Sequence, residues 1–175
     1  KMVTKHLHST LKELKKSVKG LSEAQLNFKT SPDKWSIKEC VYHLAISETN
    51  LWGWMQGTLT APANPEKRAS IKMTDTQILA GIEDRTNKVK TTENFEPKNA
   101  KWASKDEAMS FLTEERKKHI GYLKNSTDDF RNHVAEQSPL GPIDAFQIIL
   151  LMSQHTVRHK KQIEEVKTTA GYPIN

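Results

Sequence analysis

The chain has 175 residues, of which 35% are hydrophobic and 27% are charged, and it contains only seven glycines and seven prolines. These values are typical of one helix-rich globular domain, which we place at residues 1–175. No apolar run approaches the roughly 20 residues that a membrane helix needs, so a channel or a pump is excluded. We expect a cytoplasmic location. Because the sequence opens at Lys1 without an apolar leader, export after removal of a leader is the alternative.

The cysteine count and the net charge narrow the kinds of site and partner. Cys40 is the only cysteine, so the chain can form neither an internal disulfide nor a thiolate-rich zinc cluster. Any metal ion must therefore be held by nitrogen and oxygen atoms. The net charge of +6 comes from lysines scattered along the chain, without the interleaved aromatic residues of single-strand binders. We expect a small-molecule substrate as the partner, and neither nucleic acid nor a membrane.

The first half of the chain contains two predicted helices. Apolar residues recur at steps of three and four over residues 3–18, which is one face of a helix, and Gly20 ends it. Ser36 and Glu39 then form an S-x-x-E capping box, in which each side chain accepts a backbone N–H of the other residue. This box predicts a second helix that runs to about Gln56.

The middle of the chain is predicted to be mostly loop. Residues 57–73 contain two prolines and few apolar side chains, which indicates a surface connection. Thr74 and Gln77 repeat the capping pattern and predict a third, minor helix that reaches about Thr91. Residues 92–103 are expected to form a second loop.

Two long helices are predicted in the last part of the chain. Ser104 and Glu107 make a third capping box, which opens a helix to about Lys124. Prolines and a glycine within 139–142 break the chain before the most apolar helix, which is predicted over 143–169. Because no window alternates with a period of two for long enough to indicate a strand, the predicted architecture is all-α.

Two histidines lie in the apolar stripe of the last predicted helix. At steps of three and four residues, this stripe runs through Ile148, Met152, His155, His159, Ile163 and Val166. Residues i and i+4 of a helix project from nearly the same side, so the two imidazoles can share one ligand. The alternative is that each imidazole hydrogen-bonds a nearby carbonyl or carboxylate, because an unsatisfied polar group in a core costs about 1–3 kcal/mol.

A third histidine, His43, lies on the second predicted helix. It is about 100° from the centre of that helix's apolar stripe, so it is expected to point toward a neighbouring helix. Four long helices with one minor segment pack most economically as a bundle, in which facing helices contribute the side chains of any core site. His43 is therefore the candidate third ligand for the histidine pair.

Three blocks of the sequence carry a family resemblance. Residues 34–45 (KWSIKECVYHLA) resemble the W-S-x-x-E-x-x-x-H-L signature of the DinB superfamily, the DinB/YfiT-like metalloenzymes. Residues 155–163 resemble the closing H-x3-H-x2-Q-I pattern of the same family. Residues 20–26 are similar to the segment that precedes the family's tryptophan.

The resemblance implies an up-down-down-up four-helix bundle of the DinB/YfiT-like type, with a minor extra helical segment. In it, His43, His155 and His159 would bind one divalent metal ion. Zinc and nickel are metals associated with the family, and several members are thiol-dependent transferases or isomerases that use mycothiol, bacillithiol or glutathione. Homodimers are common among them. The resemblance does not identify the substrate, and the catalytic residues stay unassigned.

Three hypotheses follow for the function. Three imidazoles leave a coordination position open, as in catalytic zinc sites, where a thiol or a water can be activated. The first hypothesis is therefore a divalent-metal-dependent enzyme, either a thiol-dependent S-transferase with a low-molecular-weight thiol as co-substrate or a related hydrolase or isomerase. The second is a metal- or small-ligand-binding bundle without catalysis. The third is a structural bundle that forms a homodimer and satisfies its histidines internally.

Residues near the three histidines have competing interpretations. Glu39 is favoured as the capping glutamate, although it lies one turn before His43 and could accept a proton from its ring. Gln162 and Arg158 could contact an anionic ligand, with Arg158 expected at the surface. Cys40 is favoured as a buried core residue over a fourth ligand or a reactive thiol. No role is assigned to the remaining histidines, His6, His8, His119 and His133.

Overall fold

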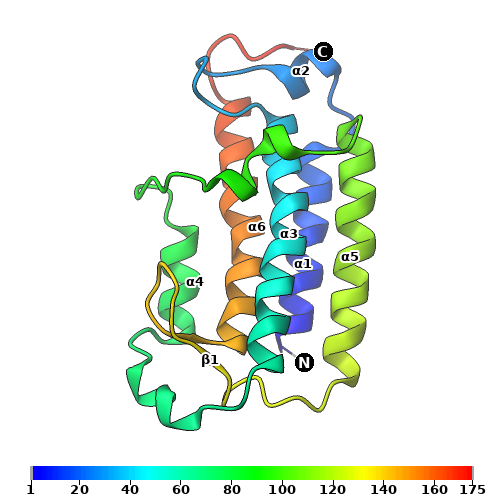
Figure 1. Ribbon diagram of the computed structural model, residues 1–175. Helices are drawn as coiled ribbons and strands as arrows, with labels where there is room; N and C mark the ends of the chain where they lie inside the picture. Colours follow the sequence, from blue (N-terminus) through cyan, green and yellow to red (C-terminus); the bar gives the residue numbers. More distant parts are fainter. Residues whose placement is uncertain (1, 175) are drawn as a thin grey trace.

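Four long helices form the body of the protein in a computed structural model that describes residues 2–174 (Figure 1). They are α1 (Met2–Val18), α3 (Ile37–Thr60), α5 (Lys105–Asn125) and α6 (Ala145–Lys167). The colours in Figure 1 show that α1 and α6 run in one direction and that α3 and α5 run in the other. This is the up-down-down-up four-helix bundle implied by the resemblance, so the predicted fold class is confirmed. α6 packs between α1 and α3, and α5 closes the other side.

The helix α3 begins where its capping box predicts. Ser36 Oγ accepts a hydrogen bond from Glu39 N, and the Glu39 carboxylate accepts one from Ser36 N at 2.8 Å. The helix runs one turn past the predicted Gln56. Ala61 ends it in an extended conformation, because Ala61 precedes Pro62 and a residue before proline is disfavoured in the helical region.

The minor helix α4 (Asp75–Glu83) packs against α6 on the outside of the bundle (Figure 1). Its start agrees with the predicted capping box, but the prediction that it reaches Thr91 is wrong. The Asp84 carboxylate accepts hydrogen bonds from both the backbone N–H and the hydroxyl of Thr86, which forms a turn. Arg158 of α6 binds carbonyl oxygens at this helix end, which an uninterrupted helix would use internally.

Short elements that the sequence did not reveal connect the helices. They are α2 (Glu23–Asn27), the 3-10 helices η1 (Pro65–Ser70), η2 (Glu93–Phe95) and η3 (Pro97–Asn99), and the antiparallel strands β1 (Val134–Ala135) and β2 (Ile143–Asp144). Elements this short contain too few residues for a period to be recognised. The strand pair also explains why α6 begins at Ala145 and not at Ile143. Asp144 belongs to β2 and caps α6, its carboxylate accepting from Gln147 N at 2.8 Å.

The bundle core has two apolar ends. One end contains Leu14, Ile37 and Leu112, and the other contains Met55 and Ile148, all with at most 1% of their surface exposed. Burial of these side chains supplies the main driving force for packing the helices. Within residues 2–174, no helix has the length and apolar character needed to cross a membrane.

A buried polar layer separates the two apolar ends. Arg116 of α5 has no exposed surface, and its Nε and Nη2 donate to the two carboxylate oxygens of Glu48 on α3, both at 2.7 Å. Nη1 donates to Leu7 O of α1 at 2.8 Å, and Nη2 also donates to Thr156 Oγ1 of α6 at 3.0 Å. One guanidinium therefore connects all four long helices.

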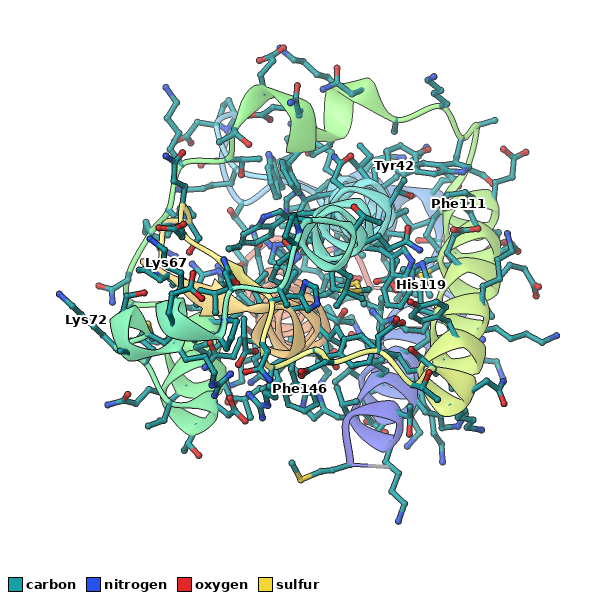
Figure 2. All side chains as sticks on the ribbon, turned by 60° about the horizontal axis from the view of Figure 1, so that its bottom comes forward. Tyr42, Lys67, Lys72, Phe111, His119 and Phe146 are labelled. Carbon is teal, nitrogen blue, oxygen red and sulfur yellow. The ribbon has the colours of Figure 1, made fainter. Side chains whose placement is uncertain are left out.

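His119 belongs to the same layer, although the sequence assigned it no role. It lies between α5 and the bundle interior (Figure 2), with Nδ1 2.9 Å from Glu48 Oε1 and its ring stacked on Trp52 at a centroid distance of 4.0 Å. Burial alone would raise the pKa of Glu48. The Arg116 guanidinium and the hydrogen bonds from Arg116 and His119 outweigh burial and hold that pKa below its ordinary value.

We predict that Arg116→Met destabilises the protein by about 3–5 kcal/mol, because the buried Glu48 carboxylate loses its cationic partner and keeps only the hydrogen bond from His119. Urea unfolding followed by circular dichroism measures the change. The double variant Glu48→Gln/Arg116→Met should be more stable than the single one, since a neutral amide replaces the unpaired charge. Lys118→Met, which removes an exposed ion pair with Glu115 on the same helix, is the control and should change stability little. Equal destabilisation by Arg116→Met and Lys118→Met would contradict this account.

Candidate metal centre

Three histidines from two helices meet on the side of the bundle where α3 and α6 pack together. His43 lies in the second turn of α3, and His155 and His159 are one turn apart on α6. His155 Nε2 lies 3.0 Å from His43 Nε2 and 2.9 Å from His159 Nε2. One nitrogen from each ring falls within 4.8 Å of the other two. The structure thus brings together the three residues that the sequence singled out.

Hydrogen bonds on the far side of two rings orient them. His43 Nδ1 is 2.7 Å from the carbonyl oxygen of Phe95, and His159 Nδ1 is 2.8 Å from Gln162 Oε1. Because an oxygen of this type only accepts, each Nδ1 carries the hydrogen and donates it. A neutral imidazole has one donor and one acceptor nitrogen, so both Nε2 atoms direct a lone pair toward the centre of the cluster.

Burial keeps the three imidazoles neutral. It lowers the pKa of His43 to about 4 and the pKa values of His155 and His159 well below their ordinary range. Repulsion adds to this effect, because a proton on His155 or His159 would lie near the Arg158 guanidinium and near any proton on a neighbouring imidazole. Neutral imidazoles are the form that binds metal ions, so this donor set fits a divalent cation.

Aromatic side chains cover part of the cluster. The Trp35 ring lies 4.7 Å from the His43 ring and 5.9 Å from the His159 ring, and the Phe95 ring lies 6.4 Å from His43. His43 and His159 are buried, whereas His155 is half-buried. The cluster is therefore shielded on the side of Trp35 and Phe95, and His155 is its least buried member.

The contacts of Glu39 and Gln162 resolve two open interpretations. Glu39 caps α3 and receives a hydrogen bond from Lys29 at 3.1 Å, while the Nδ1 of His43 binds Phe95 instead. The capping interpretation is therefore confirmed. Gln162 is the residue that orients His159. The role of Phe95 had no signal in the sequence, because its backbone carbonyl is common to every residue type.

The predicted burial of Cys40 agrees with the structure, whereas the predicted exposure of Arg158 does not. Arg158 is half-buried and not exposed as expected, and it donates to the carbonyl oxygens of Ile82, Asp84 and Asn87 at 2.6–3.1 Å. Cys40 has no exposed surface and packs in the apolar core, so the core interpretation is confirmed. Within residues 2–174, the group of side chains placed to hold a metal ion consists of the three histidines and does not include Cys40.

Comparisons with known proteins agree with this structure. Residues 6–163 match the family model described as the DinB superfamily. The uncharacterised protein YuaE of Bacillus subtilis (strain 168) is 27% identical over 152 residues, which cover 86% of this chain and 88% of YuaE. The structure of YfiT from Bacillus subtilis is described as "a probable metal-dependent hydrolase with an unusual four-helix bundle topology". It superposes on this chain with a TM-score of 0.67 at 20% sequence identity. The superposition covers 98% of this chain and 87% of the YfiT chain.

We predict that the Cys40 thiol is inert in the folded protein. Burial raises its pKa to about 12 from an ordinary 9.0, which leaves about a thousandfold less thiolate at pH 8, and the thiolate is the reactive form. Iodoacetamide labelling followed by mass spectrometry should therefore show negligible alkylation in buffer and rapid alkylation in guanidinium chloride. Equal labelling rates in both conditions would contradict the burial of Cys40.

Proposed function

The chain belongs to the DinB superfamily, and from this premise we propose that it is a metal-dependent hydrolase in which His43, His155 and His159 bind one divalent metal ion. The observation that carries the proposal is the convergence of the three Nε2 atoms, two of them held as acceptors by hydrogen bonds at Nδ1. A hydrogen on His155 Nε2 can be donated to only one of the two lone pairs that face it from His43 and His159. A shared cation satisfies all three Nε2 atoms.

The described residues would prepare the site for this ion in three ways. Phe95 O and Gln162 Oε1 hold two imidazoles in the ligand tautomer, and Trp35 shields their rings from water. His155 is the least buried of the three, so we place the approach of a substrate on its side. When bound, a divalent ion with an open position supplies Lewis-acid chemistry, activating water and polarising the bond to be hydrolysed.

We propose small substrates with an activated acyl or related bond, because the described histidine group includes no carboxylate that could act as a general base. The segment His155–His159 lacks the glutamate of the H-E-x-x-H motif, and no carboxylate joins the histidine group within residues 2–174. A peptidase with a built-in general base is therefore disfavoured. We propose zinc or nickel as the metal, because neutral imidazoles suit both ions.

The sequence also led us to expect thiol-dependent S-transfer, and that activity would use the same metal site. The two reactions differ in the nucleophile, which is water in hydrolysis and a low-molecular-weight thiol in S-transfer. The protein's only cysteine cannot serve as the thiol, since Cys40 is buried in the core. An external thiol is therefore required for the S-transferase alternative, and this requirement makes the two activities separable.

We predict that the wild-type protein binds one divalent ion per chain and that His155→Ala removes it, because only two of three ligands are left. Metal content by inductively coupled plasma mass spectrometry measures this. Added zinc should raise the unfolding temperature of the wild type and not that of the variant, since only a ligand that binds the folded state stabilises it. His8→Ala, which changes an exposed histidine of α1, is the control. Unchanged metal content in His155→Ala would end the metal-site proposal.

We predict that the metal-loaded protein hydrolyses activated esters or amides, and that a chelator or His155→Ala abolishes this activity. A panel of such substrates should be assayed with zinc, nickel and manganese, with and without bacillithiol or glutathione. Hydrolysis is expected to be independent of the thiol. Product formation that requires the thiol would replace hydrolysis by S-transfer. Absence of turnover with every metal would favour the metal- or small-ligand-binding bundle without catalysis.

A further inference from the structure

Arg85 reaches from the loop after α4 to the helix that carries two of the three histidines. Its Nε and Nη2 donate to the two carboxylate oxygens of Glu165 on α6, both at 2.9 Å. Its Nη1 points to Gln162 Oε1 at 3.4 Å. The side chain of Arg85 is only 14% exposed. The paired contact with Glu165 fixes the plane of the guanidinium, and Nη1 is thereby directed at Gln162.

The oxygen of Gln162 is shared between Arg85 and His159. The same Oε1 lies 2.8 Å from His159 Nδ1. A glutamine amide can present either its oxygen, which accepts, or its NH2 group, which donates. An arginine side chain has donors only, so Arg85 favours the orientation in which the oxygen faces it. In that orientation Gln162 accepts the Nδ1 hydrogen of His159, and His159 Nε2 is left with its lone pair toward the cluster.

The opposite orientation of Gln162 would disable His159 as a ligand. The NH2 group would then face the donors of Arg85 and would donate to His159 Nδ1. His159 would carry its hydrogen on Nε2, in the middle of the histidine cluster. His43 does not face this choice, because the backbone carbonyl of Phe95 has no donor end to present. Of the two rings held at Nδ1, His159 is therefore the one that depends on a group with two orientations.

We propose that Arg85 is a positioning residue for the metal centre, which sets the tautomer of His159 through the amide orientation of Gln162. The inference rests on the proposed function, since it concerns the same metal site. The early end of α4 supports it. Arg158 holds the carbonyl oxygens of Ile82, Asp84 and Asn87, which anchors the loop that carries Arg85 against α6.

The test compares Arg85→Met with the wild type in two measurements. The first is long-range ¹H–¹⁵N NMR of the histidine rings in metal-free protein, where wild-type His159 should be in the Nδ1–H form and the variant a mixture of tautomers. The second is zinc affinity by competition with a chelator, which should fall by about tenfold, the lower end of the effect of losing a group that orients a ligand. Lys161→Met is the matched control, because it removes another ion pair of α6, with Glu83 at the end of α4, and no contact of Lys161 with a histidine is involved. It should leave both measurements unchanged.

A second pair of variants separates orientation from general stabilisation. Gln162→Glu replaces the amide by a carboxylate that accepts from either oxygen, so His159 keeps its Nδ1 hydrogen without help. In that background Arg85→Met should no longer change the tautomer of His159 or reduce zinc affinity further. If Arg85→Met alone fails to fold, Glu165→Ala, which removes only the anchor of Arg85, should shift the tautomer in the same direction.

Two results would overturn the inference. One is a wild-type tautomer for His159 in folded Arg85→Met, or in Glu165→Ala where that variant is used. The other is an equal loss of zinc affinity from Arg85→Met in the wild-type and Gln162→Glu backgrounds. A wild-type protein that binds no metal would instead end the proposed function, while the tautomer measurement would still decide the role of Arg85.

Discussion

The buried ion pair between Arg116 and Glu48 is the constraint on which the rest of the bundle depends. Apolar helix faces can slide along one another at little cost, because hydrophobic contacts have no direction. A guanidinium without access to water must have its donors paired in one arrangement, and its partners here come from all four long helices. We interpret this layer as the device that selects one helix register.

The register has a direct consequence for the histidine cluster. Glu48 lies little more than one helical turn beyond His43 on α3, and Thr156 adjoins His155 on α6. The layer therefore ties together the two helices that supply the ligands, close to the ligands themselves. The two polar systems differ in one respect. The hydrogen bonds of Arg116 pair donors with acceptors, whereas His43 and His159 both direct an acceptor nitrogen toward a common centre. That difference separates the supporting layer from the candidate functional site.

Two of the places where the structure differs from the sequence-based predictions lie beside this site. The helix predicted to reach Thr91 ends at Glu83, and the released segment brings Arg85 to α6. The loop predicted over residues 92–103 contains η2, whose Phe95 carbonyl orients His43. The Phe95 carbonyl contacts a histidine directly, and Arg85 contacts Gln162, which contacts another. Local rules are commonly overridden at functional sites.

The sequence by itself determined the long helices and the face of each ligand. Capping boxes and apolar periodicity act within one or two turns, so they could be read along the chain, and the family motifs joined His43 to the pair on α6. Only the tertiary structure decided that the three Nε2 atoms meet, that Phe95 and Gln162 set the tautomers of two rings, and that His119 belongs to the buried ion-pair layer. These contacts depend on how separate helices pack, and His43 and His155 are 112 residues apart in the chain. No local pattern encodes a distance of that kind.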